Sequence, residues 1–161
     1  MLRQNSAFEP NGKEPNMKRA IVAFLTLIFT AATAVADEKI AATLYKTPGC
    51  LCCDWYASIL RSNGFDVKVV ESRNMTLVRI QQGVPPKLEG CHSTVVGGYV
   101  VEGHVPVAMV KRLLSEKPAI KGISLPGMPD GSPGMTGTKK GPFTVFAITN
   151  DGEPPSVFGT E

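Results

Sequence analysis

The chain has 161 residues, of which 43% are hydrophobic and 19% charged, with a formal net charge of +3 at pH 7. This length predicts one modest domain. The first 36 residues hold four of the 17 basic and two of the 14 acidic residues, which leaves 13 against 12 and a net charge of +1 for the remainder. A nearly neutral domain gives no electrostatic basis for binding nucleic acid or an anionic membrane. The remaining residues can bury an adequate core without disulfides, so the four cysteines need not be structural.

The N-terminus has the pattern of a secretory signal peptide. Lys18 and Arg19 precede an apolar run too short to span a bilayer, and Ala34-Val35-Ala36 matches a small-x-small cleavage site. The predicted organisation is an N-terminal extension over 1–16, a signal peptide over 17–36 and a mature domain over 37–161. A permanent N-terminal anchor is the alternative, and Met17 is a second candidate for the start of the chain.

Hydrophobic periodicity and turn residues predict the elements of the mature domain. Cys52, Trp55, Tyr56, Ile59 and Leu60 recur at helical spacing, and Asn63-Gly64 ends that helix. The predicted strands cover 40–45, 65–70, 94–96, 99–101 and 143–148. Two further helices are predicted over 74–82 and 106–114. The apolar residues of the 74–82 helix are Leu77, Val78 and Ile80. The resulting order is β-α-β-α-β-β-α with a C-terminal strand, which predicts an α/β (α+β) single domain of thioredoxin-like fold.

Three cysteines lie within four residues at the junction of the first strand and the first helix. Cys50 and Cys53 have the C-x-x-C spacing of a redox or metal motif, and Cys52 is one thiol more than a redox pair needs. In a thioredoxin-like topology, the start of the first helix lies beside the loop before the third strand. We therefore expect Cys91-His92 to lie against Cys50 to Cys53. The topology does not fix the position of His104.

A set of motifs from Leu44 to Met135 resembles the bacterial CopG-like periplasmic copper-resistance family. The matching motifs are Tyr45-Lys46-Thr47-Pro48-Gly49-Cys50-Leu51-Cys52-Cys53, Gly83-Val84-Pro85-Pro86, Cys91-His92-Ser93, Val95-Val96-Gly97-Gly98-Tyr99-Val100, Glu102-Gly103-His104-Val105-Pro106 and Pro126-Gly127-Met128-Pro129. The resemblance implies a periplasmic protein of thioredoxin-like fold that binds copper through cysteine-rich ligands. Leu51 departs from the small residue expected at its position, but no ligand is lost.

The softness of the candidate ligands favours Cu(I), because thiolate and thioether sulfur suit Cu(I) whereas Zn²⁺ has little use for methionine. Four thiolates around one Cu(I) would leave a charge of about −3 in a partly buried site, and bridging several ions removes that cost. We expect a multinuclear copper cluster, with Cu(II) also open. The candidate ligands are Cys50, Cys52, Cys53, Cys91, His92, His104, Met128 and Met135. Copper ions, other periplasmic copper-handling proteins and an exporter are the expected partners, with no membrane association after signal removal.

Other interpretations fit part of the same pattern. Four cysteines in an exported domain often form two structural disulfides. A thiol–disulfide oxidoreductase would use Cys50 as nucleophile and Cys53 as resolving thiol. Such enzymes carry a cis-proline before the third strand, whereas this chain has Cys91-His92-Ser93 there. We assign no catalytic residue, since the chain has no P-loop, serine triad or paired-carboxylate motif. Met75 and Met109 lie on predicted helices and are expected in the core.

Overall fold

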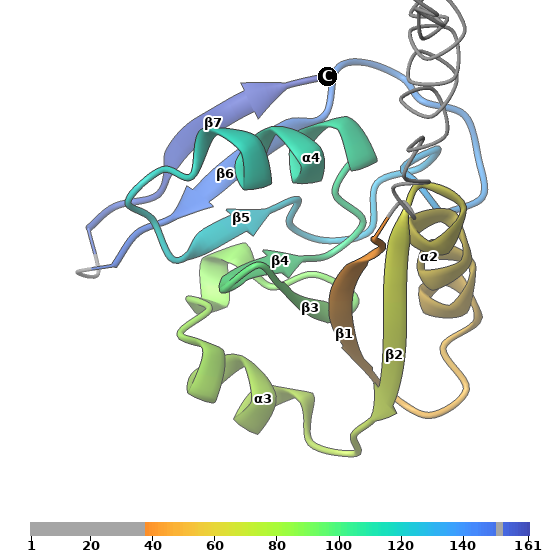
Figure 1. Ribbon diagram of the computed structural model, residues 1–161. Coiled ribbons are helices and arrows are strands. Elements are labelled where there is room, and N and C mark those ends of the chain that lie inside the picture. The colour runs from red at the N-terminus through yellow and green to blue at the C-terminus, as the bar shows by residue number, and fades with distance from the viewer. Residues whose placement is uncertain (1–37, 151–152) are drawn as a thin grey trace, which may run out of the picture. The chain divides into compact units, whose positions relative to one another are not determined.

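Strand β1 (Ile40–Lys46) lies inside a mixed sheet of strand order β2-β1-β3-β4-β5-β6-β7 (Figure 1). The computed structural model describes residues 38–150 and 153–161. The other elements are α2 (Leu51–Ser62), β2 (Phe65–Glu71), α3 (Met75–Gln82), the 3₁₀ helix η2 (Pro86–Leu88), β3 (Ser93–Val96), β4 (Tyr99–Glu102), α4 (Val107–Glu116), β5 (Gly122–Ser124), β6 (Thr144–Ile148) and β7 (Ser156–Thr160).

The sheet combines parallel and antiparallel pairs. Strand β1 pairs in parallel with β2 and antiparallel with β3, which pairs antiparallel with β4. Strand β5 continues the sheet in parallel with β4, and β6 and β7 follow antiparallel. The predicted mixed α/β class and the order β-α-β-α-β-β-α with a C-terminal strand are confirmed. The thioredoxin-like description of the fold stays a prediction.

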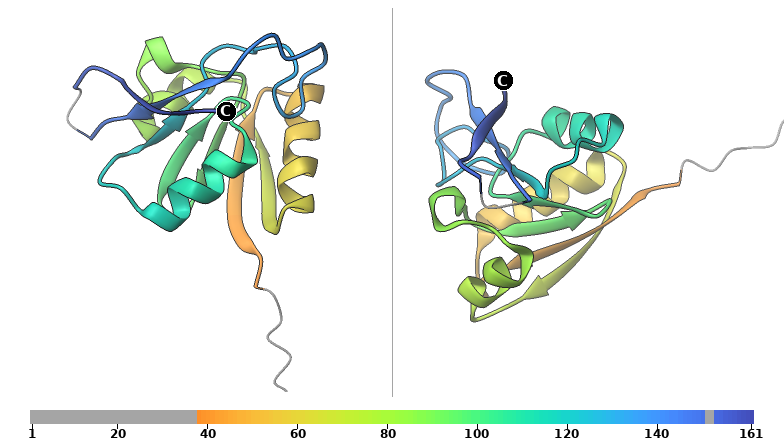
Figure 2. Two further views of the ribbon diagram at one scale, coloured as in Figure 1. Left: turned by 90° about the horizontal axis from the view of Figure 1, so that it is seen from above. Right: turned by 90° about the vertical axis from the view of Figure 1, so that its left-hand side faces the viewer.

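Helices α2 and α4 cover one face of the sheet and α3 lies on the other (Figure 2). The larger core cluster joins α2 and α4 to residues of β1, β2, β3 and β4, including Leu44, Val67 and Val101. A smaller cluster on the opposite face holds Val84, Leu88, Val100 and Ile148. As expected, Met75 and Met109 are buried.

The buried face of helix α2 overlaps the predicted one only in part, at Tyr56 and Leu60. Its buried side chains are Cys53, Tyr56, Ala57 and Leu60, at the i, i+3, i+4, i+7 spacing of a single stripe. The predicted stripe is displaced by about one position, and Trp55 is 50% exposed. Because Ala57 is small, the helix can pack close to the sheet at this position. The indole of Trp55 lies outside the packing surface between the helix and the sheet. This rotation places the Cys53 sulfur in the core and leaves Cys52 only half-buried.

Helix α3 has the predicted bounds, but the side chains that it buries differ from the predicted ones. Asn74 accepts a hydrogen bond from the Leu77 backbone N–H at 3.0 Å, and Gly83 ends the helix in the left-handed region at φ 70°. Two of its predicted apolar positions, Leu77 and Ile80, are 48% and 67% exposed, whereas Arg79 is buried. The prediction of an apolar face is therefore wrong, because the Arg79 guanidinium pairs with a carboxylate inside the protein.

The β3–β4 hairpin turns at Gly97-Gly98, between the two predicted strands, and both glycines have positive φ. Helix α4 starts one residue after the predicted Pro106, which is its N-cap, and ends two residues later than predicted. Strands β5 and β7 were not predicted, and they extend the sheet beyond β4 on both sides of β6.

The predicted extension, signal peptide and cleavage site lie outside the described residues. Within the part of the chain that is described, no helix combines the length and the apolar character needed to cross a membrane.

Candidate metal centre

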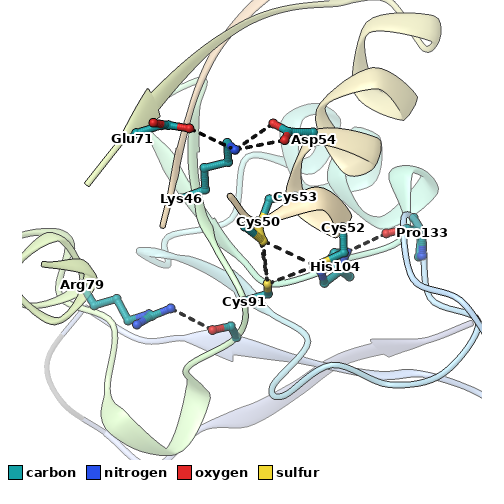
Figure 3. Close-up of a disulfide and its surroundings, with 11 residues drawn as sticks. Lys46, Cys50, Cys52, Cys53, Asp54, Glu71, Arg79, Cys91, His104 and Pro133 are labelled. Atoms are coloured by element: carbon teal, nitrogen blue, oxygen red, sulfur yellow. Dashed lines mark hydrogen bonds and ion pairs between the residues drawn. A yellow bond between two sulfur atoms is a disulfide. The ribbon is translucent and has the colours of Figure 1, made fainter. Parts of the chain in front are cut away.

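The cysteine segment lies at the junction of β1 and α2. Lys46, the last residue of β1, is buried, and its Nζ lies 3.0 Å from Asp54 in the first turn of α2 and 3.3 Å from Glu71 at the end of β2 (Figure 3). Burial disfavours the ammonium charge, but the two carboxylates outweigh it and raise the pKa of Lys46. These ion pairs connect β1, α2 and β2 beside the cysteine segment.

The four cysteine sulfurs meet as the sequence predicts. All four Sγ atoms lie within 4.8 Å of one another. Cys50 and Cys53 form a disulfide, and Cys52 and Cys91 are free thiols. The Cys91 Sγ is 3.4 Å from those of Cys50 and Cys52 and 3.3 Å from that of Cys53 (Figure 3). Cys91 therefore lies at the centre of the group, although it is 38 positions beyond Cys53 in the chain.

The Cys91 thiol is hard to ionise in this setting. Burial, followed by the neighbouring Cys52 thiol, raises the pKa of Cys91 to about 12. Arg79 acts in the opposite direction. Without a metal ion, Cys91 is therefore protonated at neutral pH, and a metal that binds its sulfur must displace the proton.

Both histidines lie fully buried beside this sulfur. A ligand atom from each of Cys91, His92 and His104 falls within a 4.8 Å group, and the two imidazole centroids are 4.7 Å apart. His104 Nδ1 is 2.7 Å from the Pro133 carbonyl oxygen (Figure 3). Its Nε2 and both ring nitrogens of His92 have no hydrogen-bond partner among the described residues. The structure thus places His104, whose position the sequence does not predict.

Burial keeps both imidazoles neutral. It lowers the pKa of His92 well below its usual value, and the pKa of His104 in the same direction. Tyr56 packs against both rings, at centroid distances of 4.5 Å and 5.6 Å, and donates its hydroxyl to the Val105 carbonyl at 2.8 Å. The imidazoles therefore present lone pairs, not charge, to their surroundings.

A buried ion pair holds the loop before Cys91. Arg79 Nε donates to Glu102 Oε1 at 2.7 Å, and the Arg79 guanidinium also donates to the Gly90 carbonyl at 2.8 Å. The Gly90 N–H donates to the same Glu102 oxygen at 2.9 Å. Glu102 is fully buried, and burial raises the pKa of its carboxyl although Arg79 opposes the shift.

Two glycines bring the ligand-bearing segments together. A Cβ on Gly90 would lie 2.5 Å from the Gly103 Cα, so neither backbone leaves room for a side chain between them. Gly103 has φ 77°, and its N–H donates to the His92 carbonyl at 2.8 Å. Cys91-His92 and His104 are therefore joined through backbone contacts and through the Arg79–Glu102 pair.

The loop over 126–135 covers the imidazole side of the group. A Cβ on Gly134 would lie 2.8 Å from the Cys52 carbonyl oxygen, which shows how closely the loop packs on the start of α2. Pro133 supplies the bond to His104. Met135 is half-buried and Met128 is 57% exposed, so this loop carries both methionine candidates. Their part in the site stays a prediction.

Sequence reasoning missed the groups that support this centre. Lys46, Tyr56, Arg79 and Glu102 contact the cysteine and histidine segments but carry no metal-ligand signature. The burial of Arg79 had one signal in the sequence, which is a charged residue between apolar residues of a predicted helix. An arginine in such a pattern is more often exposed to solvent than buried. The donor set itself, four sulfurs and two neutral imidazoles, suits soft and borderline metal ions such as copper.

The fold and the centre together define a mixed α/β domain that gathers sulfur and imidazole donors from separate segments. Residues 88–135 match the family described as "Protein of unknown function, DUF411". No curated protein matches the chain in a sequence comparison. Two solved structures, described as "Copper resistance protein copG" Form 2 and Form 1, are each 35% identical in sequence to this chain. Each match covers 77% of this chain, and it covers 99% of the Form 2 chain and 98% of the Form 1 chain. The TM-scores are 0.71 for Form 2 and 0.70 for Form 1. The chain belongs to the CopG copper-resistance family.

Proposed function

We propose that the protein holds copper as Cu(I) in a multinuclear, cysteine-bridged cluster and serves in copper resistance. The observation that carries this proposal is the meeting of four sulfurs from two distant segments within 4.8 Å, beside two buried imidazoles. Two solved relatives that carry the name copper resistance protein support it. The proposed ligands are the four cysteines, His92 and His104, with Met128 and Met135 from the covering loop.

Binding by all four cysteines requires the reduced protein. An external dithiol reductant supplies the two electrons and two protons that convert the Cys50–Cys53 disulfide into two thiols, and the reductant is itself oxidised to a disulfide. Each thiol then releases its proton when its sulfur binds copper. Bridging thiolates share their negative charge among several Cu(I) ions, which lowers the cost of keeping that charge away from water. The number of ions is therefore expected to exceed one per chain.

A Cu(I) titration tests this proposal. Reduced protein is titrated anaerobically with Cu(I) and, separately, with Zn²⁺, and bound metal per chain is measured after desalting. We expect more than one Cu(I) per chain and tighter retention of copper than of zinc. Free copper 100-fold above its dissociation constant should stabilise the domain by about 2.7 kcal/mol for each independent site and raise its melting temperature. Saturation at a single Zn²⁺, with copper bound no better, contradicts the cluster.

A thiol–disulfide oxidoreductase is the second candidate function. The observation that favours it is the Cys50–Cys53 disulfide itself, which has the spacing of a dithiol redox pair and starts at the N-terminus of α2. Against it, the Cys91 sulfur contacts both disulfide sulfurs, and Cys91-His92-Ser93 occupies the stretch where the redox enzymes of the predicted fold carry a cis-proline.

The place of action is also a proposal. A signal peptide over 17–36 would deliver a mature domain over 37–161 to the periplasm. N-terminal sequencing of protein recovered from the periplasmic fraction should begin at Asp37. Recovery of the chain from membranes with residues 18–36 still attached would show an anchored protein instead.

A further inference from the structure

Strand β2 forms an open edge of the sheet, because within residues 38–150 and 153–161 only β1 lies beside it. Before the strand begins, the Gly64 carbonyl accepts a hydrogen bond from the Ile40 N–H at 2.9 Å. After the strand ends, the Ser72 N–H donates to the Lys46 carbonyl at 2.8 Å. The even-numbered positions of β2 therefore bond to β1. The backbone N–H and C=O groups of the odd-numbered positions, 65 to 71, face away from β1, where another strand can add.

Asp66 and Lys68 lie on one face of this edge strand. Both side chains are exposed, and neither takes part in an ion pair within the described part of the chain. Together with Thr43 and Val95 they line an open hollow of about 410 Å³ on the sheet. Charged residues usually protect an edge strand, because a second strand brings like charges together or leaves a charge without a partner. The spacing of these two charges removes that protection against one particular partner.

The sequence of β2 is self-complementary when two copies pair antiparallel about Val67. Val67 then faces its own counterpart, and its outward N–H and C=O form the hydrogen-bonded pair. Asp66 of each copy lies opposite Lys68 of the other, so the two-fold axis generates the same ion pair twice. The two neighbouring registers that keep the hydrogen bonds would place Asp66 against Asp66 or Lys68 against Lys68. Charge therefore selects a second copy of this chain and a single register.

Arg61 occupies the centre of this edge. It lies in the last turn of α2, and its guanidinium donates to the outward Val67 carbonyl at 2.7 Å. That oxygen is the acceptor that the self-pairing needs beside its two-fold axis. A hydrogen bond from a charged donor is stronger than one between neutral groups, so a second copy must displace a competitive donor. The Arg61 bond therefore opposes association.

The opposite edge of the sheet is less suited to self-pairing. Strand β7 has a register shift against β6 at Val145/Phe146, of the kind that a β-bulge produces. Arg112 donates to the Phe158 carbonyl at 3.3 Å, and its guanidinium carbon lies 4.7 Å from the Phe158 ring centroid. The strand also contains no charged side chain that could select a register. Of the two edges, β2 is the regular one that carries a self-complementary pair of charges.

We propose that the β2 edge is a self-association surface, on which two copies of this chain pair antiparallel about Val67, and that the Arg61 bond limits this pairing. The two sheets become one continuous sheet across the two-fold axis. An interface of one short strand from each copy is small, so the wild-type dimer is weak and forms at high protein concentration. The surface is separate from the metal centre, and its test uses metal-free protein, so its outcome does not depend on the copper function.

Removal of Arg61 tests the surface. The disulfide forms of wild type, Arg61→Ala and Arg73→Ala are compared by sedimentation over a range of protein concentrations, with a chelator present. Arg73→Ala is the matched control, because Arg73 is exposed and follows the end of β2 by two positions. We expect Arg61→Ala to lower the dimer dissociation constant at least about tenfold and Arg73→Ala to leave it unchanged. Non-reducing denaturing electrophoresis shows whether a disulfide links the copies. An Arg61→Ala protein that is as monomeric as the wild type overturns the proposal.

Charge reversal tests the register in the Arg61→Ala protein. Adding either Asp66→Lys or Lys68→Asp places like charges opposite each other twice, so each variant alone should be monomeric. An equal mixture of the two variants restores both pairs of opposite charges and should form a heterodimer. Both substituted positions are exposed, so each variant should melt close to its parent. Self-association of either variant, or a mixture of folded variants that stays monomeric, contradicts the pairing about Val67.

Hydrogen exchange locates the contact without relying on charge. The outward N–H groups of Val67 and Val69 gain partners in the second copy, so their exchange should slow as protein concentration rises. The effect should appear in the wild type and be larger in Arg61→Ala, whereas exchange in β7 should not change. Dimers without slower exchange at Val67 place the contact elsewhere. Slow exchange at every concentration shows that a segment of the same chain covers β2, and either result overturns the proposal.

Discussion

Arg79→Met is expected to lower the free energy of unfolding of the metal-free domain by about 3–5 kcal/mol. The substitution removes one partner of a buried ion pair and leaves the Glu102 carboxylate inside with no counter-charge. It also removes the donor to the Gly90 carbonyl. Because small domains are stable by about 5–15 kcal/mol, this loss is a large part of the total. Urea unfolding of the disulfide form measures it.

Matched substitutions separate the charge from the shape of Arg79. Arg79→Lys keeps the charge but cannot donate to Glu102 and Gly90 in the same forked geometry, so an intermediate loss is expected. The double variant Arg79→Met/Glu102→Gln should recover much of the loss, since no uncompensated charge stays buried. If Arg79→Met changes stability by less than about 1 kcal/mol, or if the double variant is no more stable than Arg79→Met, the ion pair does not stabilise the domain in this way.

The double variant also tests positioning, because it should fold and yet lack the bonds that fix Gly90. Gly90 directly precedes Cys91 and touches Gly103, which precedes His104. Release of this contact should weaken copper retention although every ligand is present. Full copper retention in a folded double variant would mean that the glycine packing alone positions the ligands.

The meeting of the four cysteines could be predicted because it depends on strand order alone. The motif at the end of β1 and the residues before β3 belong to neighbouring strands, so their side chains meet at one end of the sheet. The position of His104 was not predictable in the same way. It depends on the left-handed backbone at Gly103 and on the bond from His104 to a carbonyl in the 126–135 loop, and neither follows from periodicity.

The faces of the helices were less predictable than their ends. Asn74 caps the start of α3 through a local hydrogen bond, and Gly83 ends the helix in the left-handed conformation. Both residue types are helix-end signals that can be recognised in the sequence. The buried face depends on partners far along the chain. Arg79 is inside because Glu102 is inside, and the exposed positions of Leu77 and Ile80 follow from that pair.

Strands β5 and β7 were missed for a related reason. Strand β5 has three residues, too few for alternation to appear, and it exists because β4 and β6 lie on its two sides. Strand β7 covers Ser156–Thr160, directly after Pro154-Pro155. Its strand character comes from pairing with β6, whose own prediction was confirmed.

The second large effect is expected from the sulfur of Cys52. Reduced Cys52→Ser protein should bind at least one copper ion fewer per chain than the wild type, because a serine hydroxyl is too hard and too weakly acidic to replace a bridging thiolate. The metal-free fold should survive, since Cys52 is half-buried, serine is nearly isosteric and the start of a helix tolerates serine. Leu51→Ala is the matched control, because Leu51 lies in the same turn, is 66% exposed and offers no ligand atom.

Copper per chain and disulfide-reductase activity, measured on the same preparations of wild type, Cys52→Ser and Leu51→Ala, test the central claim most directly. A redox enzyme needs only Cys50 and Cys53, one to attack and one to resolve the mixed disulfide. A copper cluster needs the additional sulfur. We therefore predict reduced copper in Cys52→Ser alone and little reductase activity in any of the three. Unchanged copper in Cys52→Ser, together with robust reductase activity in all three, would contradict the copper cluster and identify a thiol–disulfide oxidoreductase.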